Sequence, residues 1–318
     1  MNSHCKKEMT DPSVTFVGLD VSKARLDSFV PGGKPRADDN TPKGHAAFIK
    51  RLQGLQNPRV ICEASGGYER PAVAALLAAG TGICVVPPGR VRHFALAEGL
   101  LAKTDSIDAQ LLARYGDKIR PPLELPADPA AVRLREMLDY RRLISDRRVA
   151  TSSQLDVAQG YLREGLQAQL AALKAALRQV NKDIAAHLKA EPALGAKAKR
   201  LRQLCGVGPV LAATLLAYLP ELGLLGDKTL ASLVGVAPHP CDSGKHRGKR
   251  RIRGGRAVVR DVLYMAAVTA STHNTILSAL YQRLTARGKL PKVAMVAVMR
   301  KMLSVLNRMI ADPQFSLA

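Results

Sequence analysis

The sequence contains no tryptophan, and aromatic residues make up only 4% of its 318 residues. Aromatic stacking is therefore not expected to be its main means of recognition. The five cysteines are far apart and include no C-x-x-C pair, so neither a disulfide framework nor a cysteine zinc site is predicted. Long apolar runs and an N-terminal secretion signal are also missing, so we expect a cytoplasmic protein without a membrane span.

Acidic residues are scarce relative to basic ones. The chain has 48 Lys and Arg against 26 Asp and Glu, for a net charge of +22, while 47% apolar residues are enough for a sizeable core. The net charge is +4 in residues 1–125, +3 in residues 126–195 and +15 in residues 196–318. A polyanionic partner is predicted, nucleic acid before an anionic membrane, with the binding surface mainly in the last third.

Residues 1–125 alternate between short apolar runs and helical patterns. Strands are expected over residues 14–20, 25–30, 59–63 and 82–86. Helices are expected over residues 45–55, 68–79, 90–99 and 106–115. The alternation predicts an α/β domain with a parallel or mixed sheet covered by helices.

Residues 126–195 form the second predicted domain, which begins in a proline-rich linker over residues 121–129. No proline interrupts residues 130–190. Apolar residues follow an approximate heptad pattern at Leu162, Leu166, Leu170, Leu173, Leu177, Val180, Ile184 and Leu188. A long coiled-coil helical segment is predicted. An antiparallel hairpin, a coiled coil between chains and a helix packed within one domain all satisfy the pattern.

Residues 196–318 form the third predicted domain, which is mainly helical. Gly206 and Gly208 stand between two helical patterns in the run LCGVGPVLAATLLAYL. A helix, a Gly-x-Gly turn and a second helix are typical of a helix-hairpin-helix element. The backbone amides of such an element contact nucleic-acid phosphates without reading sequence.

Carboxylates occur where a metal site is expected in the first domain. Asp20 and Glu63 each end a predicted strand, and ligand sites of open α/β folds lie at such strand ends. Asp105 and Asp108 are three residues apart, which places them on one face of a helix. Asp105 also fits an N-cap at the start of that helix. Such a cluster would suit Mg²⁺, and two ions could assist an in-line displacement at phosphorus.

A serine precedes a basic segment in the third domain. Ser243 lies in an Asp-Ser-Gly sequence, which is also an ordinary turn sequence. Residues 245–260 contain no acid, and eight of these sixteen residues are basic: Lys245, Arg247, Lys249, Arg250, Arg251, Arg253, Arg256 and Arg260. Prolines and glycines predict a loop or hairpin here. The cations are expected to contact phosphates, and the serine hydroxyl is a candidate nucleophile.

Five motifs resemble, in order and spacing, those of the DEDD-type insertion-sequence transposases, a family that includes site-specific invertases of pilin genes. They are VGLDVSK, CEASGGYER, AKTDSIDAQLLARY, LCGVGPVLAATLLA and LVGVAPHPCDSGKHRGKRRIRGGRAVVRDVLYMAA. The resemblance covers nearly all of the chain. It implies an RNase H/RuvC-like first domain in which Asp20, Glu63, Asp105 and Asp108 bind metal.

The same resemblance implies that Ser243 forms a covalent phosphoserine link to DNA. It further implies double-stranded donor and target DNA, a noncoding guide (bridge) RNA, a dimer-to-tetramer assembly and a bacterial, nucleoid-associated location. We therefore expect a Mg²⁺-assisted serine recombinase. Two other interpretations stay open: a Holliday-junction-type metal-dependent endonuclease that uses water, and a non-enzymatic nucleic-acid-binding protein.

Overall fold

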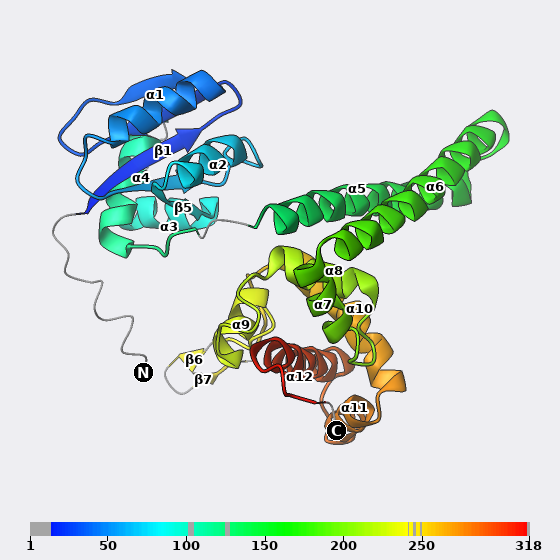
Figure 1. Cartoon of the computed structure of the whole chain (residues 1–318). Coiled ribbons are helices and arrows are strands. Elements are labelled where there is room, and N and C mark those ends of the chain that lie inside the picture. The colour runs from blue at the N-terminus through cyan, green and yellow to red at the C-terminus, as the bar shows by residue number, and fades with distance from the viewer. Residues whose placement is uncertain are drawn as a thin grey trace. The chain divides into compact units, whose positions relative to one another are not determined.

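The computed structural model describes residues 14–100, 105–124, 128–240, 242–243, 246–248 and 250–316 (Figure 1). Within these ranges, the side chains of residues 105–107, 243, 246 and 247 are outside the description. The chain forms two compact units, Met1–Pro126 and Ala127–Ala318. The predicted division of the second unit near residue 195 stays a prediction.

The first unit is built on a five-stranded mixed sheet. Its strands are β1 (Thr15–Val21), β2 (Arg25–Phe29), β3 (Arg36–Asp39), β4 (Pro58–Glu63) and β5 (Gly82–Val86). Their order across the sheet is β3-β2-β1-β4-β5. The neighbours β1, β4 and β5 are parallel, whereas β2 and β3 are antiparallel. The predicted α/β class is confirmed, with a mixed sheet.

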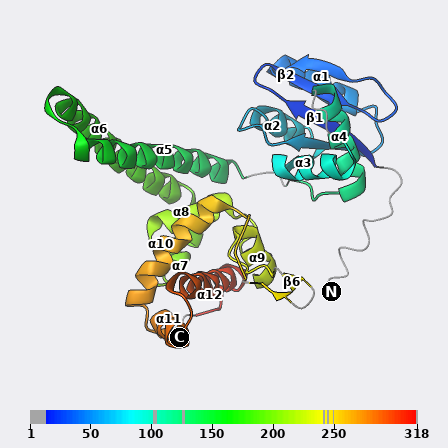
Figure 2. The same cartoon turned by 180° about the vertical axis from the view of Figure 1, so that it is seen from behind.

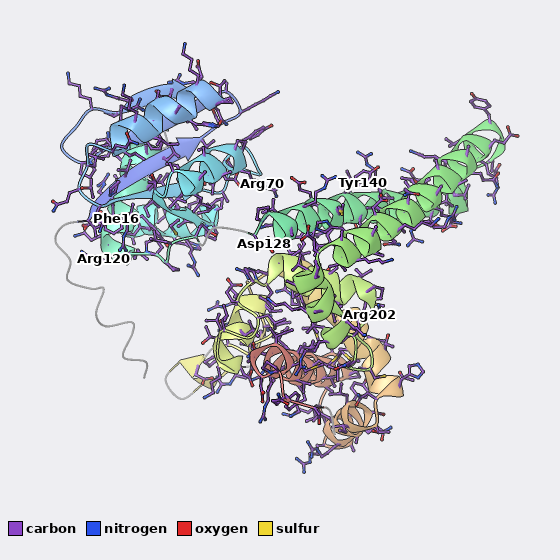
Figure 3. All side chains as sticks on the ribbon, viewed as in Figure 1. Phe16, Arg70, Arg120, Asp128, Tyr140 and Arg202 are labelled. Atoms are coloured by element: carbon purple, nitrogen blue, oxygen red, sulfur yellow. The ribbon has the colours of Figure 1, made fainter. Side chains whose placement is uncertain are left out.

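Helices cover both faces of this sheet, because the central strands are apolar on both sides. One face packs Val17, Leu19 and Cys62 in a cluster with residues of α1 (Pro42–Leu52) and α2 (Arg70–Ala78). The other face packs Phe16 and Ile61 in a cluster with residues of α3 (Pro88–Ala97) and α4 (Asp105–Ile119). The side chains of Phe16 and Arg120 are labelled in Figure 3, and the Arg120 guanidinium lies 6.0 Å from the centroid of the Phe16 ring.

The four predicted strands and four predicted helices of this unit are present, with ends shifted by a few residues. The sequence pattern missed β3. Its four residues, Arg-Ala-Asp-Asp, have no apolar alternation, and it pairs only with β2 at the edge of the sheet. Charged residues are common on edge strands because they discourage pairing with another chain.

The second unit begins with a helical hairpin. α5 (Pro129–Val157) and α6 (Gly160–Ala190) run side by side in both views (Figures 1 and 2). Arg141 donates to Asn181 (2.7 Å), and His187 lies 2.8 Å from the carbonyl oxygen of Ala130, so the helices are antiparallel. Of the predicted heptad positions in α6, Val180 and Ile184 are buried within this unit, whereas Leu162 is 62% exposed.

The rest of this unit packs around one apolar core. It comprises α7 (Pro192–Leu201), α8 (Pro209–Tyr218), α9 (Asp227–Val234), α10 (Ala257–His273), α11 (Thr275–Ala286) and α12 (Pro291–Ala311). α8 is nearly all buried, whereas α12 buries an apolar face and exposes its cations. Among the described residues, no helix is long and apolar enough to cross a membrane.

Candidate functional site: a carboxylate edge and a basic serine hairpin

Asp20 and Glu63 lie at the same edge of the sheet. In the parallel pairing of β1 with β4, Gly18 is opposite Ile61 and Leu19 is opposite Cys62. Asp20 and Glu63 are one residue beyond the last of these pairs. Because the carboxyl ends of parallel strands meet at one edge, the two acids are neighbours across adjacent strands.

Helix α4 covers the face of β1 that carries Asp20. Side chains alternate along a strand, so Phe16, Gly18 and Asp20 share a face. At Gly18 the helix comes so close that a Cβ would lie 1.8 Å from the carbonyl oxygen of Ala109. Only glycine allows this approach. The missing side chain at position 18 thus determines how closely α4 lies beside Asp20.

Helix α4 also carries the other two predicted ligands. Asp108 is half-buried and immediately precedes Ala109, the residue that contacts Gly18. Asp105 is the first residue of α4, about one turn before Asp108, and its side chain is outside the described residues. The backbone thus brings Asp20, Glu63 and the start of α4 to one region of the first unit.

The pKa of the Cys62 thiol is sensitive to the negative charge of this region. Burial raises its pKa, and the nearby carboxylates of Glu69, Asp20 and Glu63 raise the pKa further. Cys62 itself is fully buried on the opposite face of β4 from Glu63. The thiol is therefore held protonated, and we assign it no chemical role.

Glu69 organises the loop that follows Glu63, and it is not among the site residues predicted from the sequence. One of its carboxylate oxygens accepts hydrogen bonds from the Ser65 amide (3.0 Å), the Ser65 hydroxyl (2.9 Å) and the Gly67 amide (2.8 Å). Burial by itself would raise the pKa of Glu69, but these hydrogen bonds outweigh burial and lower it. The signal available in the sequence was an acid two residues after the Gly66-Gly67 pair in CEASGGYER.

The donor set at the carboxylate edge fits a hard divalent cation, because such ions take oxygen ligands and carboxylates supply them. Among the described side chains, no group of three or more His, Cys, Asp or Glu lies close enough together to hold a metal ion. The side chain of Asp105 lies outside the described residues. The predicted Mg²⁺ site, with one ion or two, stays a prediction.

Ser243 belongs to a small β-hairpin in the second unit. β6 (Asp242–Ser243) pairs antiparallel with β7 (His246–Arg247), so that Ser243 is opposite His246. An isolated bridge between His239 and Arg251 extends the pairing toward the base of the hairpin. The predicted loop or hairpin is confirmed as a hairpin, and Ser243 is the last strand residue before its tip.

Asp242 holds the two sides of this hairpin together. Its carboxylate accepts hydrogen bonds from the Gly248 amide (3.1 Å) and from the Arg250 guanidinium (2.8 Å). Both Asp242 and Arg250 are exposed, so the ion pair by itself contributes little to stability. Its consequence is geometric, because it ties the residue next to Ser243 to the opposite strand.

The predicted nucleic-acid-binding cations differ in what they contact. Arg250, Arg251 and Arg253 are exposed. The side chains of Lys245, Arg247 and Lys249 lie outside the described residues.

Arg256 and Arg260 make contacts within the protein. Arg256 binds both carboxylate oxygens of Glu221 and donates to the carbonyl oxygen of Tyr218 (3.0 Å). Arg260 donates to the carbonyl oxygen of Gly254. These contacts attach the basic segment to the core of the second unit. The sequence did not indicate them, because Glu221 lies 35 residues before Arg256.

The two glycines of the predicted helix-hairpin-helix lie between α7 and α8. Gly206 has a φ of 95°, and a Cβ there would lie 2.8 Å from the carbonyl oxygen of Ala266. Gly208 is exposed and is the N-cap of α8. Gly206 thus packs against α10, whereas Gly208 faces solvent. Contact of either glycine with nucleic acid stays a prediction.

A mixed α/β unit with carboxylates at its sheet edge, followed by a helical unit with a basic hairpin, defines a class: enzymes that act on nucleic-acid phosphates. Residues 17–158 match the family model DEDD_Tnp_IS110, described as "Transposase". Residues 198–282 match the "Transposase IS116/IS110/IS902 family".

Two curated relatives extend this match along the chain. The pilin gene-inverting protein of Moraxella lacunata is 25% identical over 304 residues, which cover 92% of this chain and 94% of the relative. The pilin gene-inverting protein of Moraxella bovis is 24% identical over the same length. The chain belongs to the DEDD-type transposases of the IS110 family, and it is a DNA recombinase or transposase.

Proposed function

We propose that this transposase cuts and rejoins double-stranded DNA through a serine nucleophile assisted by divalent metal. The first unit would be an RNase H/RuvC-like domain of residues 1–125. The second unit would divide into a coiled-coil domain (126–195) and a transposase domain (196–318). The observation that carries the proposal is the placement of Asp20 and Glu63 on adjacent parallel strands, with α4 held beside them at Gly18.

Asp20, Glu63, Asp105 and Asp108 would hold the metal, which we propose to be Mg²⁺ at one or two positions. When bound, it supplies positive charge that stabilises the oxygens of the reacting phosphate. Such a cation would reduce the repulsion between carboxylates that share one edge of the sheet.

Ser243 would supply the nucleophile. Its Oγ forms a bond to phosphorus while the bond from phosphorus to the leaving DNA oxygen breaks. The serine gives up its proton, and the leaving oxygen gains one. The phosphodiester is thereby conserved as a phosphoserine link, which a DNA hydroxyl can attack to rejoin the strands. The hairpin pairing that fixes the backbone of Ser243, with the arginines beside it, supports this role.

A covalent adduct tests the nucleophile directly. Wild-type protein is incubated with labelled donor and target DNA and Mg²⁺, then denatured, and a protein-linked DNA band is sought. We expect the band with wild type and its loss in Ser243→Ala. If wild type cleaves DNA without forming an adduct, the serine is not the nucleophile, and the alternative of a nuclease that uses water is supported. Undiminished recombination by Asp20→Asn would overturn the metal site.

The remaining partners are proposed from the family resemblance and from charge. Residues 262–311 contain seven Lys and Arg and no acid, which adds to the basic character of the second unit. We propose a noncoding guide RNA and an assembly of two to four chains. Sequencing of copurifying nucleic acid and measurement of the mass of the assembly test both. Recombination by protein that contains no RNA would contradict the proposal that a guide RNA is needed.

A further inference from the structure

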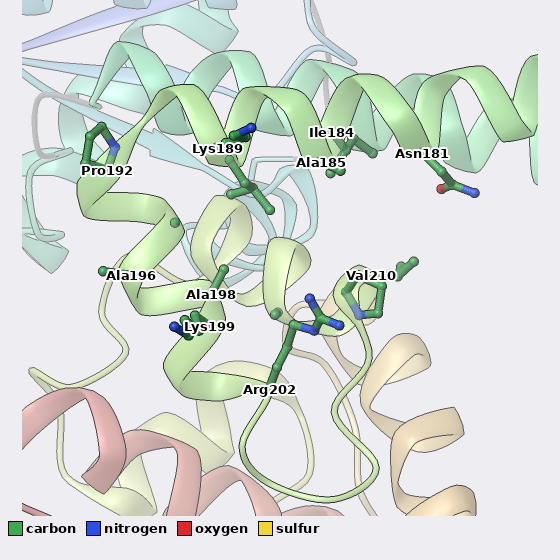
Figure 4. Close-up of a pocket in the computed structure, with 14 residues that line it drawn as sticks. Asn181, Ile184, Ala185, Lys189, Pro192, Ala196, Ala198, Lys199, Arg202 and Val210 are labelled. Carbon is green, nitrogen blue, oxygen red and sulfur yellow. The ribbon is translucent and has the colours of Figure 1, made fainter.

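An open cavity of about 870 Å³ lies in the second unit between α6, α7 and the start of α8 (Figure 4). Its floor is apolar. Ile184 of α6 and Ala198 of α7 are nearly buried, and Ala212 of α8 is fully buried. Val210 and two prolines complete the apolar lining. The position differs from the carboxylate edge and from the serine hairpin. Its α8 end adjoins Gly208 of the predicted helix-hairpin-helix, whereas its α6 and α7 walls belong to no predicted site.

Cations surround this apolar floor. Lys189, Lys199 and Arg202 line the cavity and are exposed, and none of the fourteen described residues that line it is acidic. Figure 4 shows the side chain of Arg202 extending toward Val210 at the start of α8. The charge of the cavity is thus complementary to an anion.

The start of α8 adds to the same preference. Its N-cap is Gly208, which has no side chain to accept hydrogen bonds from the first amides of the helix. The positive end of α8 therefore lies at the cavity, where Pro209 and Val210 form part of the wall. An occupant with phosphates beside an apolar body satisfies both the cations and the floor.

A single DNA strand has this chemistry, and a duplex does not, because stacking inside the duplex covers the apolar faces of its bases. DNA is favoured over RNA as the occupant because the proposed function cuts and exchanges DNA strands.

We propose that this cavity, the α6–α8 groove, binds an unpaired segment of a DNA strand, with its phosphates on Lys189, Lys199 and Arg202 and a base or sugar on the apolar floor. The inference rests on the proposed strand-cutting function, since cut and exchanged strands are unpaired for part of the reaction. It adds a place where the second unit holds such a strand away from the serine hairpin.

Binding of a fluorescein-labelled oligothymidylate to the full-length protein tests the groove. The titrations contain EDTA, so that their outcome is independent of strand cutting. For Lys199→Ala/Arg202→Ala we expect the slope of log affinity against log salt to fall by about 1.4, since each single-strand phosphate contact contributes about 0.7. Oligouridylate and a DNA duplex, titrated in parallel, should lose less affinity.

A matched pair of substitutions on α6 separates the groove from general electrostatics. Ala185 and Ala175 are both exposed, but only Ala185 lines the groove. Ala185→Glu should weaken oligothymidylate binding about fivefold more than Ala175→Glu, because its carboxylate stands beside a phosphate. Both variants place a good helix former at an exposed helical position, and circular dichroism verifies their folding.

Three outcomes would overturn the inference: equal losses in the two glutamate variants, an unchanged salt slope, or losses confined to the duplex or to RNA. The last outcome would assign the groove to another nucleic acid. A failure of this kind leaves the Ser243 adduct unaffected. Conversely, an absent adduct with a positive groove result removes the serine mechanism and keeps the strand-binding site.

Discussion

Gly18 of β1 lies directly beneath the backbone of Ala109 in α4, with no room for a side chain between them. This contact joins the strand that carries Asp20 to the helix that carries Asp108. The distance between two of the predicted metal ligands thus depends on a residue that has no functional group. The same close packing makes the contact open to test.

Gly18→Ala should destabilise the first unit and reduce metal-dependent cleavage. The added Cβ must displace α4, and overpacking of this kind costs about 1–3 kcal/mol. Urea unfolding measures the stability, and the covalent adduct measures the activity. Gly89→Ala is the control, since a Cβ there meets nothing within 4 Å and Gly89 lies within α3. Wild-type activity in Gly18→Ala would show that α4 tolerates the shift.

Glu69→Gln should weaken the first unit at neutral pH and reduce its sensitivity to acid. The pKa of Glu69 is lowered from 4.5, so its contribution to stability is present above that pH and is lost as the pH falls through the lowered value. Removing the charge should cost about 1–3 kcal/mol at pH 7. Urea titrations from neutral to acid pH measure the effect. If the free energy of unfolding changes with pH in the same way for wild type and variant, the assigned role of the Glu69 charge is wrong.

Arg256→Lys should destabilise the second unit, because lysine cannot bind both oxygens of Glu221 at once. The ion pair is partly exposed, at 35% and 27%, so the expected loss is only about 1 kcal/mol after allowance for solvent screening. Burial would raise the pKa of Glu221, but the hydrogen bonds from Arg256 outweigh burial and lower it. Thermal unfolding monitored by circular dichroism measures the loss.

Arg253→Ala, in contrast to Arg256→Lys, should weaken DNA binding and leave the stability of the second unit nearly unchanged. Arg253 is exposed, so its removal should change stability by less than about 0.5 kcal/mol. The salt slope for duplex DNA should fall by about 0.9 if the side chain contacts one phosphate. Fluorescence anisotropy at several salt concentrations measures it. An unchanged slope would place Arg253 away from the DNA.

Removal of divalent metal should abolish the covalent adduct and leave duplex binding by the basic hairpin intact. The carboxylates lie in the first unit and the hairpin in the second, so the two properties rest on separate groups. EDTA followed by readdition of Mg²⁺ should restore the adduct. An adduct that forms equally well in EDTA would exclude the metal-assisted mechanism.

Local pattern predicted the elements that carry the candidate site. Asp20 and Glu63 follow apolar runs, which made them strand-end acids, and the spacing of Asp105 and Asp108 placed them on one helix. The hairpin around Ser243 was predicted by its glycines and prolines. The edge strand β3 was missed because its sequence is charged and exposed.

The tertiary structure decided which of these residues meet. The heptad pattern of α6 was compatible with a partner in the same chain or in another. The structure pairs α6 with α5 of the same chain, and a coiled coil between chains stays a prediction. Arg256 and Glu221 acquire their roles only through a contact between residues that are 35 positions apart in the sequence.

The sequence by itself determined the family of this protein and the candidate groups for its chemistry: the strand-end carboxylates, the acid-free basic segment and the serine. The tertiary structure alone decided that Gly18 admits α4 beside Asp20, that Arg256 binds Glu221 while Arg253 is exposed, and that three helices enclose a basic groove. The physical reason is the distance along the sequence over which a local pattern constrains contacts. Spacing along a strand or helix constrains neighbours within a few residues, whereas contacts between distant segments depend on how whole elements pack.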